Sequence, residues 1–142
     1  MNWSGPAFVL CLTTVFASAQ EYPLRAKYPD LVPISAEQLA REIGSAAVVD
    51  VRSDFEFTVM HIEGAVHVDL SDKDFPGRLS TAGGGDKSKM VVTYCNGQTC
   101  EKSYEAAQKA RFTRVRVFDA GILEWARLVF LRGAMAPLVS PR

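Results

Sequence analysis

Two cysteines five positions apart, Cys95 and Cys100, are the residues of this chain best placed to do chemistry. Residues 91–94 before Cys95 form a short apolar run typical of a buried strand, and a glycine-containing loop and then a helix are expected after it. A thiolate at such a strand end is stabilised by loop amides and by the partial positive charge of a helix start. We therefore expect Cys95 to have a depressed pKa and to act as a sulfur nucleophile.

Cys100 has three interpretations that the sequence leaves open. It forms a disulfide with Cys95, it resolves a persulfide or sulfenate on Cys95, or it fills space in the loop. The loop around it is the candidate substrate-binding segment, with these members: Asn96, Gly97, Gln98, Thr99, Cys100, Glu101 and Lys102.

Other chemistries fit the pattern less well. The spacing of Cys95 and Cys100 relative to His61 and His67 matches no zinc finger or ribbon, so we expect no metal site and no other cofactor. A cysteine phosphatase or arsenate reductase needs arginine six positions after the cysteine, where Glu101 would repel an oxyanion. An inert core thiol is the remaining alternative for Cys95.

Composition indicates an ordinary globular domain. The 142 residues suit one domain, and the 48% hydrophobic fraction is enough for a core without a metal or a disulfide scaffold. Sixteen basic residues balance sixteen acidic ones, so there is no electrostatic footprint for nucleic acid or for an anionic membrane. We expect no nucleic-acid partner.

The first residues have the features of an export signal. No charged side chain precedes Glu21, and residues 7–17 form an apolar run too short to span a bilayer. Small residues follow, so we predict a signal peptide over residues 1–19, with cleavage after Ala19 or, as a second candidate, after Ala17. A membrane-anchored or buried N-terminal helix is the alternative. After cleavage, we expect a secreted or periplasmic protein with no stable membrane insertion, in which Cys95 and Cys100 remain as a pair.

The remaining chain alternates helices with strands. Ser35 with Gln38 predicts a capping box that opens a helix, and Gly44 is its expected stop. The predicted segments are an extended lead-in over 20–33, helices over 35–43, 53–57, 102–110 and 122–131, strands over 46–51, 65–68, 90–94 and 114–118, a turn over 61–64, an irregular surface loop over 71–89 and a flexible tail over 133–142. This order predicts a single α/β domain over residues 34–132, with a mostly parallel sheet flanked by helices.

Five short motifs then occur in order across about residues 34–130: Val49-Asp50-Val51-Arg52, His61-Ile62-Glu63-Gly64-Ala65, Tyr94-Cys95, Ala106-Ala107 and Gly121-Ile122-Leu123-Glu124-Trp125. Together they resemble the rhodanese (sulfurtransferase) family. The resemblance implies a single rhodanese-like domain that transfers sulfane sulfur through a persulfide on Cys95. It also implies that the amides of residues 96–101 cradle that sulfur, and that Asp50 and Arg52 support the strand ends and the loop.

The loop differs from the common pattern of the family. Cys100 and Glu101 stand where many single-domain members have arginine and serine, and Lys102 is the nearest replacement for the arginine's charge. The first hypothesis is an exported sulfurtransferase with a thiosulfate-type donor and a thiol or cyanide acceptor, and with a periplasmic protein as a further candidate partner. The alternatives are a periplasmic thiol–disulfide redox protein that uses Cys95 and Cys100, or a non-catalytic rhodanese-like binding module.

Overall fold

The computed structural model describes residue 1, residues 22–132 and residues 138–139. The predicted signal peptide, apart from Met1, and most of the predicted tail lie outside these residues. In chain order the elements are η1 (Pro23–Arg25), α1 (Ala36–Glu42), β1 (Ala47–Asp50), α2 (Asp54–Val59), β2 (His61–Ile62), β3 (Val66–His67), α3 (Phe75–Ala82), β4 (Met90–Tyr94), α4 (Lys102–Lys109), β5 (Arg114–Phe118), α5 (Gly121–Arg132) and β6 (Leu138–Val139).

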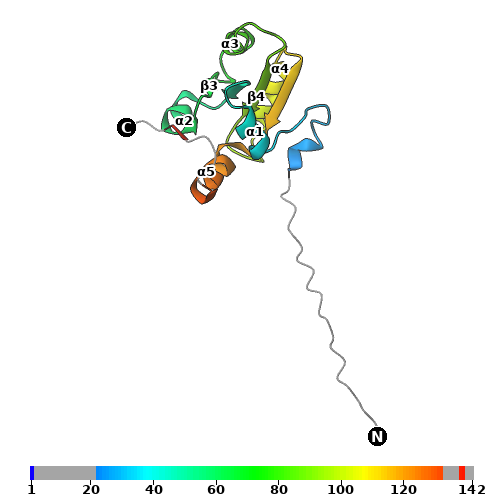
Figure 1. Ribbon diagram of the computed structural model, residues 1–142. Helices are drawn as coiled ribbons and strands as arrows, with labels where there is room; N and C mark the ends of the chain where they lie inside the picture. Colours follow the sequence, from blue (N-terminus) through cyan, green and yellow to red (C-terminus); the bar gives the residue numbers. More distant parts are fainter. Residues whose placement is uncertain (2–21, 133–137, 140–142) are drawn as a thin grey trace.

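The centre of the fold is a four-stranded parallel sheet in the order β3-β1-β4-β5. Every residue of the two inner strands, β1 and β4, is buried. Continuous apolar runs suit strands covered on both faces, which is why the sequence pattern predicted these strands. Helices lie on either side of the sheet (Figure 1), so the predicted α/β fold with a parallel sheet is confirmed.

The side chains of the strands alternate between two layers of core. One layer joins Val48 and Val92 to α1 and α5, and Trp125 of α5 is fully buried in it. The other layer joins Val49 and Val91 to α3 and α4. Cys95 belongs to this second layer, so it faces the α3 and α4 side of the sheet.

Serine caps start the first two α-helices. Ser35 accepts a hydrogen bond from the amide of Gln38, whose side chain accepts from the Ser35 amide, so the predicted capping box is confirmed. Ser53 and Glu56 form a second capping box at the start of α2. Gly44 follows α1 with a φ of 96°, a conformation that L-amino acids with a side chain rarely adopt.

The prediction of an irregular loop over residues 71–89 is wrong, because this segment contains helix α3. Pro76 lies in the first turn, where its missing N–H costs nothing, and Phe75 and Leu79 are buried one turn apart. The buried face consists of these two apolar residues, and the glycine and polar residues around them leave no helical periodicity that the sequence could show.

Two other segments are more ordered than their sequence suggested. The expected extended lead-in contains the 3-10 turn η1, and Tyr28 is buried against Tyr104 of α4. The expected turn over 61–64 begins with β2, which pairs with β6 from within the expected tail. Both depend on partners far away in the chain, which local patterns do not report.

No helix among the described residues is long and apolar enough to cross a membrane.

Candidate active site around Cys95

Cys95 comes directly after β4, at the carboxyl end of the central strands. Only 2% of the residue is exposed, and it packs in a cluster with Val49, Val51 and Ala106. Ligands of open parallel sheets bind at this edge. The structure therefore puts the sulfur where the sequence predicted, but it buries the sulfur more deeply than an accessible thiol requires.

A disulfide joins Cys95 to Cys100, with a Cα–Cα separation of 6.2 Å. Of the three interpretations of Cys100, this is the first. Cys100 is half-buried, and its sulfur is covalently bonded to the sulfur of Cys95. In this oxidised form Cys95 is no nucleophile, so any chemistry at Cys95 requires the disulfide to open first.

Backbone hydrogen bonds from α5 hold the loop. The amide of Ile122 donates to the carbonyl of Cys95 at 2.9 Å, and the amide of Leu123 donates to the carbonyl of Asn96 at 3.2 Å. Gly121 begins α5 with a φ of 68°, and a Cβ there would lie 2.5 Å from the carbonyl carbon of Asn96. Within the loop, the Cys100 amide donates to the Gly97 carbonyl, so this amide serves the loop's own turn rather than a sulfur cradle.

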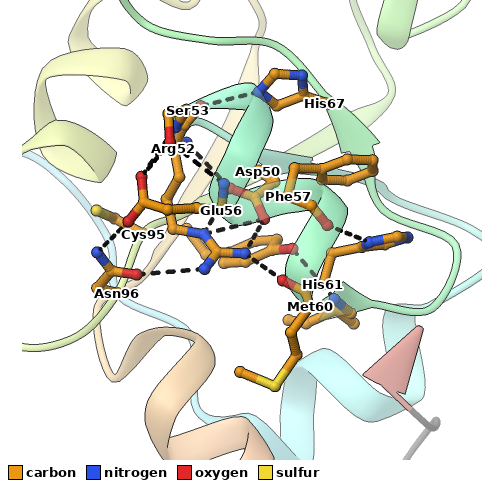
Figure 2. A network of polar contacts seen from close by, with 12 residues as sticks. Asp50, Arg52, Ser53, Glu56, Phe57, Met60, His61, His67, Cys95 and Asn96 are labelled. Atoms are coloured by element: carbon orange, nitrogen blue, oxygen red, sulfur yellow. Dashed lines mark hydrogen bonds and ion pairs between the residues drawn. The ribbon is translucent and has the colours of Figure 1, made fainter. Parts of the chain in front are cut away.

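Arg52 ties the loop to the end of β1 through buried polar contacts (Figure 2). Its guanidinium donates to Asp50 at 2.6 and 2.9 Å, to the carbonyl of Met60 at 2.6 Å and to the side-chain oxygen of Asn96 at 3.3 Å. Asp50 is fully buried and Arg52 is 4% exposed. These contacts fit the supporting role expected for Asp50 and Arg52.

Glu56 of α2 contacts the side-chain nitrogen of Asn96, whereas Arg52 contacts the side-chain oxygen. The Asn96 nitrogen donates to Glu56 at 2.8 Å, and the hydroxyl of Ser53 donates to the second carboxylate oxygen at 2.7 Å. Hydrogen bonds from Asn96 and then Ser53 lower the pKa of Glu56 from 4.5 to about 2. Asn96 is thus fixed from two sides, next to Cys95 (Figure 2).

A hollow of about 430 Å³ lies against the loop. Cys100 lines this hollow and Cys95 does not. It is lined by Asn96, Gly97, Gln98, Thr99, Cys100, Ala120, Leu123, Glu124 and Arg127. Arg127 pairs with Glu124 through contacts of 2.5 and 2.7 Å, so the cation beside the loop is already neutralised.

The last two members of the predicted substrate-binding segment lie apart from this hollow. Glu101 contacts Lys27 and Tyr28 of the N-terminal segment, and these hydrogen bonds lower the pKa of its carboxyl group. Lys102 is exposed at the start of α4. The structure thus groups residues 96–100 of the prediction around the hollow and directs Glu101 elsewhere.

Sequence reasoning missed the residues of α5 that line the hollow, namely Leu123, Glu124 and Arg127. The spacing of Glu124 and Arg127 suits a pair on one helix face, but nothing local showed that this face meets the loop. It also missed Glu56 as the anchor of Asn96, although Ser53 and Glu56 have the spacing of a capping box. Among the described residues, no group of three or more His, Cys, Asp or Glu residues is arranged to hold a metal ion.

Comparison with known families agrees with this geometry. The family model of the rhodanese-like domain matches residues 35–128. The chain therefore belongs to the rhodanese-like domain family.

Solved structures share the fold. The BH2092 protein from Bacillus halodurans is 26% identical, with a TM-score of 0.58 over 72% of this chain and 77% of that one. A thiosulfate sulfurtransferase from Pseudomonas aeruginosa is 20% identical, with a TM-score of 0.61 over 84% of this chain and 22% of that one. This second likeness concerns the fold alone.

Curated relatives are larger proteins. An HTH-type transcriptional regulator, Rv0324, of Mycobacterium tuberculosis is 33% identical over 87 residues, which cover 60% of this chain and 36% of the regulator. A tRNA uridine(34) hydroxylase of Listeria welshimeri is 32% identical over 82 residues, which cover 56% of this chain and 26% of the hydroxylase. The chain thus spans about a third or less of the length of these relatives.

Proposed function

We propose that this protein is a sulfurtransferase that carries sulfane sulfur as a persulfide on Cys95. The observation that supports this most strongly is the position of Cys95, at the carboxyl end of a central strand of a rhodanese-like domain. Contacts from α5 to the carbonyls of Cys95 and Asn96 hold its backbone in place, so the residue is preorganised in a loop whose following residues, 96–100, line a hollow.

The reaction begins once a thiol reductant has opened the disulfide. The Cys95 thiolate attacks the outer sulfur of a donor such as thiosulfate, the donor's S–S bond breaks, and sulfite leaves with the electron pair. A thiol or cyanide then attacks the outer sulfur of the persulfide and regenerates the Cys95 thiolate. Each turn is a ping-pong cycle with no metal or organic cofactor.

A thiol–disulfide redox protein is the second candidate. The Cys95–Cys100 bond favours it, because a dithiol that closes to a disulfide exchanges electrons without any sulfur donor. Intact-mass spectrometry separates the two candidates. Gain of one sulfur atom on reduced Cys100→Ser protein given thiosulfate supports sulfur transfer, and no adduct on that protein, with a stable disulfide in the protein that has both cysteines and no release of sulfite or sulfide, supports redox exchange.

Substitution of each cysteine tests the proposal. We expect Cys95→Ala to abolish thiosulfate-to-cyanide sulfur transfer, because the attacking sulfur is gone, and Cys100→Ala to retain at least part of it. Steady-state assays under a reducing thiol measure both, with exposed Gln108→Ala on α4 as the control. Full activity in Cys95→Ala would refute the assignment, and background rates in all proteins with several donors would indicate a non-catalytic binding module.

Export from the cytoplasm is part of the same proposal. Cleavage after Ala19 would leave every described contact of the N-terminal segment intact, since the described residues of that segment that pack on the domain begin at Tyr22. The intact mass of the protein recovered from the periplasm or the medium measures the cleavage point. A mass that still includes residues 1–19 would contradict it.

A further inference from the structure

We propose that Cys100 is a second catalytic nucleophile, whose thiolate attacks the inner sulfur of a Cys95 persulfide, expels hydrosulfide and forms the Cys95–Cys100 disulfide. This inference rests on the proposed function, because it needs the persulfide. It makes the protein a sulfide-releasing reductase of sulfane sulfur in which transfer to an external acceptor is the competing outcome.

The first support is that the fold brings the two sulfurs together by contacts that do not depend on the disulfide. The carbonyls of Cys95 and Asn96 accept hydrogen bonds from α5, and the Asn96 side chain is held by Arg52 and Glu56. On the other side of the loop, the Cys100 amide donates to the Gly97 carbonyl. None of these contacts uses a cysteine side chain, so reduction of the disulfide removes no atom that takes part in them.

The second support comes from the backbone of the loop. No residue from 96 to 100 has a positive φ, so the closed loop does not store left-handed strain that would drive Cys100 away when the bond opens. Thiols held in register react as if at very high local concentration. Intramolecular attack by Cys100 should therefore outpace a dilute external acceptor.

The third support is the difference in burial between the two sulfurs. Cys95 is 2% exposed and does not line the hollow, whereas Cys100 does. An external acceptor that enters through this hollow passes Cys100, which borders it. Cys100 is thus the first thiol that a persulfide on Cys95 meets.

The step balances without an outside oxidant. The bond between the Cys95 sulfur and the outer sulfur breaks, and the bond between the Cys95 and Cys100 sulfurs forms. The outer sulfur takes the electron pair and leaves as hydrosulfide, so it is reduced by two electrons while the two cysteines are oxidised by two. The proton lost from Cys100 is taken up by solvent or by the leaving sulfide.

A small thiol then resets the site. The thiolate attacks the sulfur of Cys100, the cysteine that lines the hollow, and Cys95 leaves as the thiolate. A second thiol attacks the mixed disulfide on Cys100 and frees it. In sum, thiosulfate and two thiols give sulfite, sulfide and one disulfide of the small thiol.

The test uses single-turnover reactions of the purified protein in a Cys11→Ser background, so that Cys95 and Cys100 are the only thiols. Protein is reduced, freed of reductant and mixed with thiosulfate in the absence of acceptor. We expect the unsubstituted pair to release stoichiometric sulfide and to lose the mass of two hydrogens relative to the reduced protein. We expect Cys100→Ala and Cys100→Ser to release none and to gain the mass of one sulfur atom.

The outcomes separate the two proposals. A stable sulfur adduct on the protein that has both cysteines, without sulfide, refutes the role of Cys100 and leaves sulfur transfer intact. Equal sulfide release with and without Cys100 refutes it as well. Absence of any adduct on folded Cys100→Ser, checked by circular dichroism, refutes the proposed function itself.

The reset step has its own measurement. Oxidised protein treated with limiting cysteine and then blocked with N-ethylmaleimide should carry the cysteine adduct on Cys100 and the maleimide on Cys95 in peptide maps. The reverse placement would refute attack at Cys100.

Discussion

At the scale of single residues, the charges around the loop are arranged differently from their order in the chain. Glu101 lies next to Cys100 in sequence, yet its carboxylate contacts Lys27 and Tyr28. Arg127 is far from the loop in sequence, yet it lines the hollow beside it. Because Glu124 pairs with Arg127, the hollow presents a neutralised cation rather than an open anion site.

Removal of the Glu124 charge should improve binding of an anionic donor. Glu124→Gln leaves the Arg127 guanidinium uncompensated, and we expect the KM for thiosulfate to fall by roughly 2- to 5-fold, the range of an exposed ion pair. Steady-state kinetics at low and high salt measure it, since screening should erase the gain. Exposed Glu63→Gln is the control. An unchanged KM at low salt would show that the donor does not meet Arg127.

We expect a lysine ammonium at position 52 to stabilise the domain less than the Arg52 guanidinium does. Arg52→Lys cannot donate at once to Asp50, Asn96 and the Met60 carbonyl, and it leaves the buried Asp50 carboxylate poorly paired. We expect the free energy of unfolding to fall by about 2–4 kcal/mol in urea titrations. Arg114→Lys, at an exposed position of β5, should change it by less than about 0.5 kcal/mol. Equal effects of the two substitutions would contradict this account.

At the scale of elements, the start of α5 fixes the loop more directly than the helix that follows the loop. The first amides of α5 donate to the carbonyls of Cys95 and Asn96. Gly121 permits this approach, since its backbone passes against the Asn96–Gly97 peptide. Glycine is needed at position 121 because a side chain there would collide with the backbone of the loop.

Gly121→Ala should be more costly than an ordinary glycine substitution. It adds a methyl group 2.5 Å from loop backbone and also forces alanine to a φ of 68°. We expect a loss of about 2–4 kcal/mol in unfolding free energy, from overpacking added to backbone strain. Gly64→Ala is the matched control, because Gly64 has a φ of 80° and no atom within 4 Å of the added Cβ, so it should cost about 1 kcal/mol. Similar losses of unfolding free energy in the two variants would show that the loop moves aside for the added methyl group at little cost.

The helices and strands differ in how far local sequence predicted them. The capping box of Ser35 and Gln38 and the apolar runs of β1 and β4 are local signals, and they located α1 and the central strands. Helix α3 has only Phe75 and Leu79 as buried residues, so its apolar face was too narrow to be seen. Its stability comes from packing on the sheet, which is a tertiary effect.

At the scale of the whole molecule, the N-terminal segment is part of the domain rather than a lead-in. Arg25 pairs with Asp119 at 2.7 Å, and Tyr104 donates to the same carboxylate at 2.6 Å. Burial, then the Asp119 hydrogen bond, raises the pKa of Tyr104. Together with the contacts of Glu101 to Lys27 and Tyr28, these interactions connect residues 22–33 to α4 and to the end of β5.

Stability of the whole domain should depend on the Glu56 carboxylate in acid. Its pKa falls from 4.5 to about 2 on folding, so its contribution is complete above pH 4.5 and is lost as the pH falls toward 2. We expect Glu56→Gln to lower the unfolding free energy at pH 6 by about 1 kcal/mol, and the gap from wild type to close between pH 4.5 and 2. Urea titrations across this range measure it, with Glu63→Gln as the control. A gap that stays constant with pH would contradict the assignment.

The sequence by itself determined the α/β class, the central strands, the cap of the first α-helix and the place of Cys95 at a strand end. These features depend on periodicity and on neighbours a few residues apart. Tertiary structure alone decided that Cys100 bonds to Cys95, that Glu101 contacts the N-terminal segment and that Arg127 faces the loop. Each of these depends on side-chain geometry or on which backbone segments meet, which residue type and spacing leave undetermined.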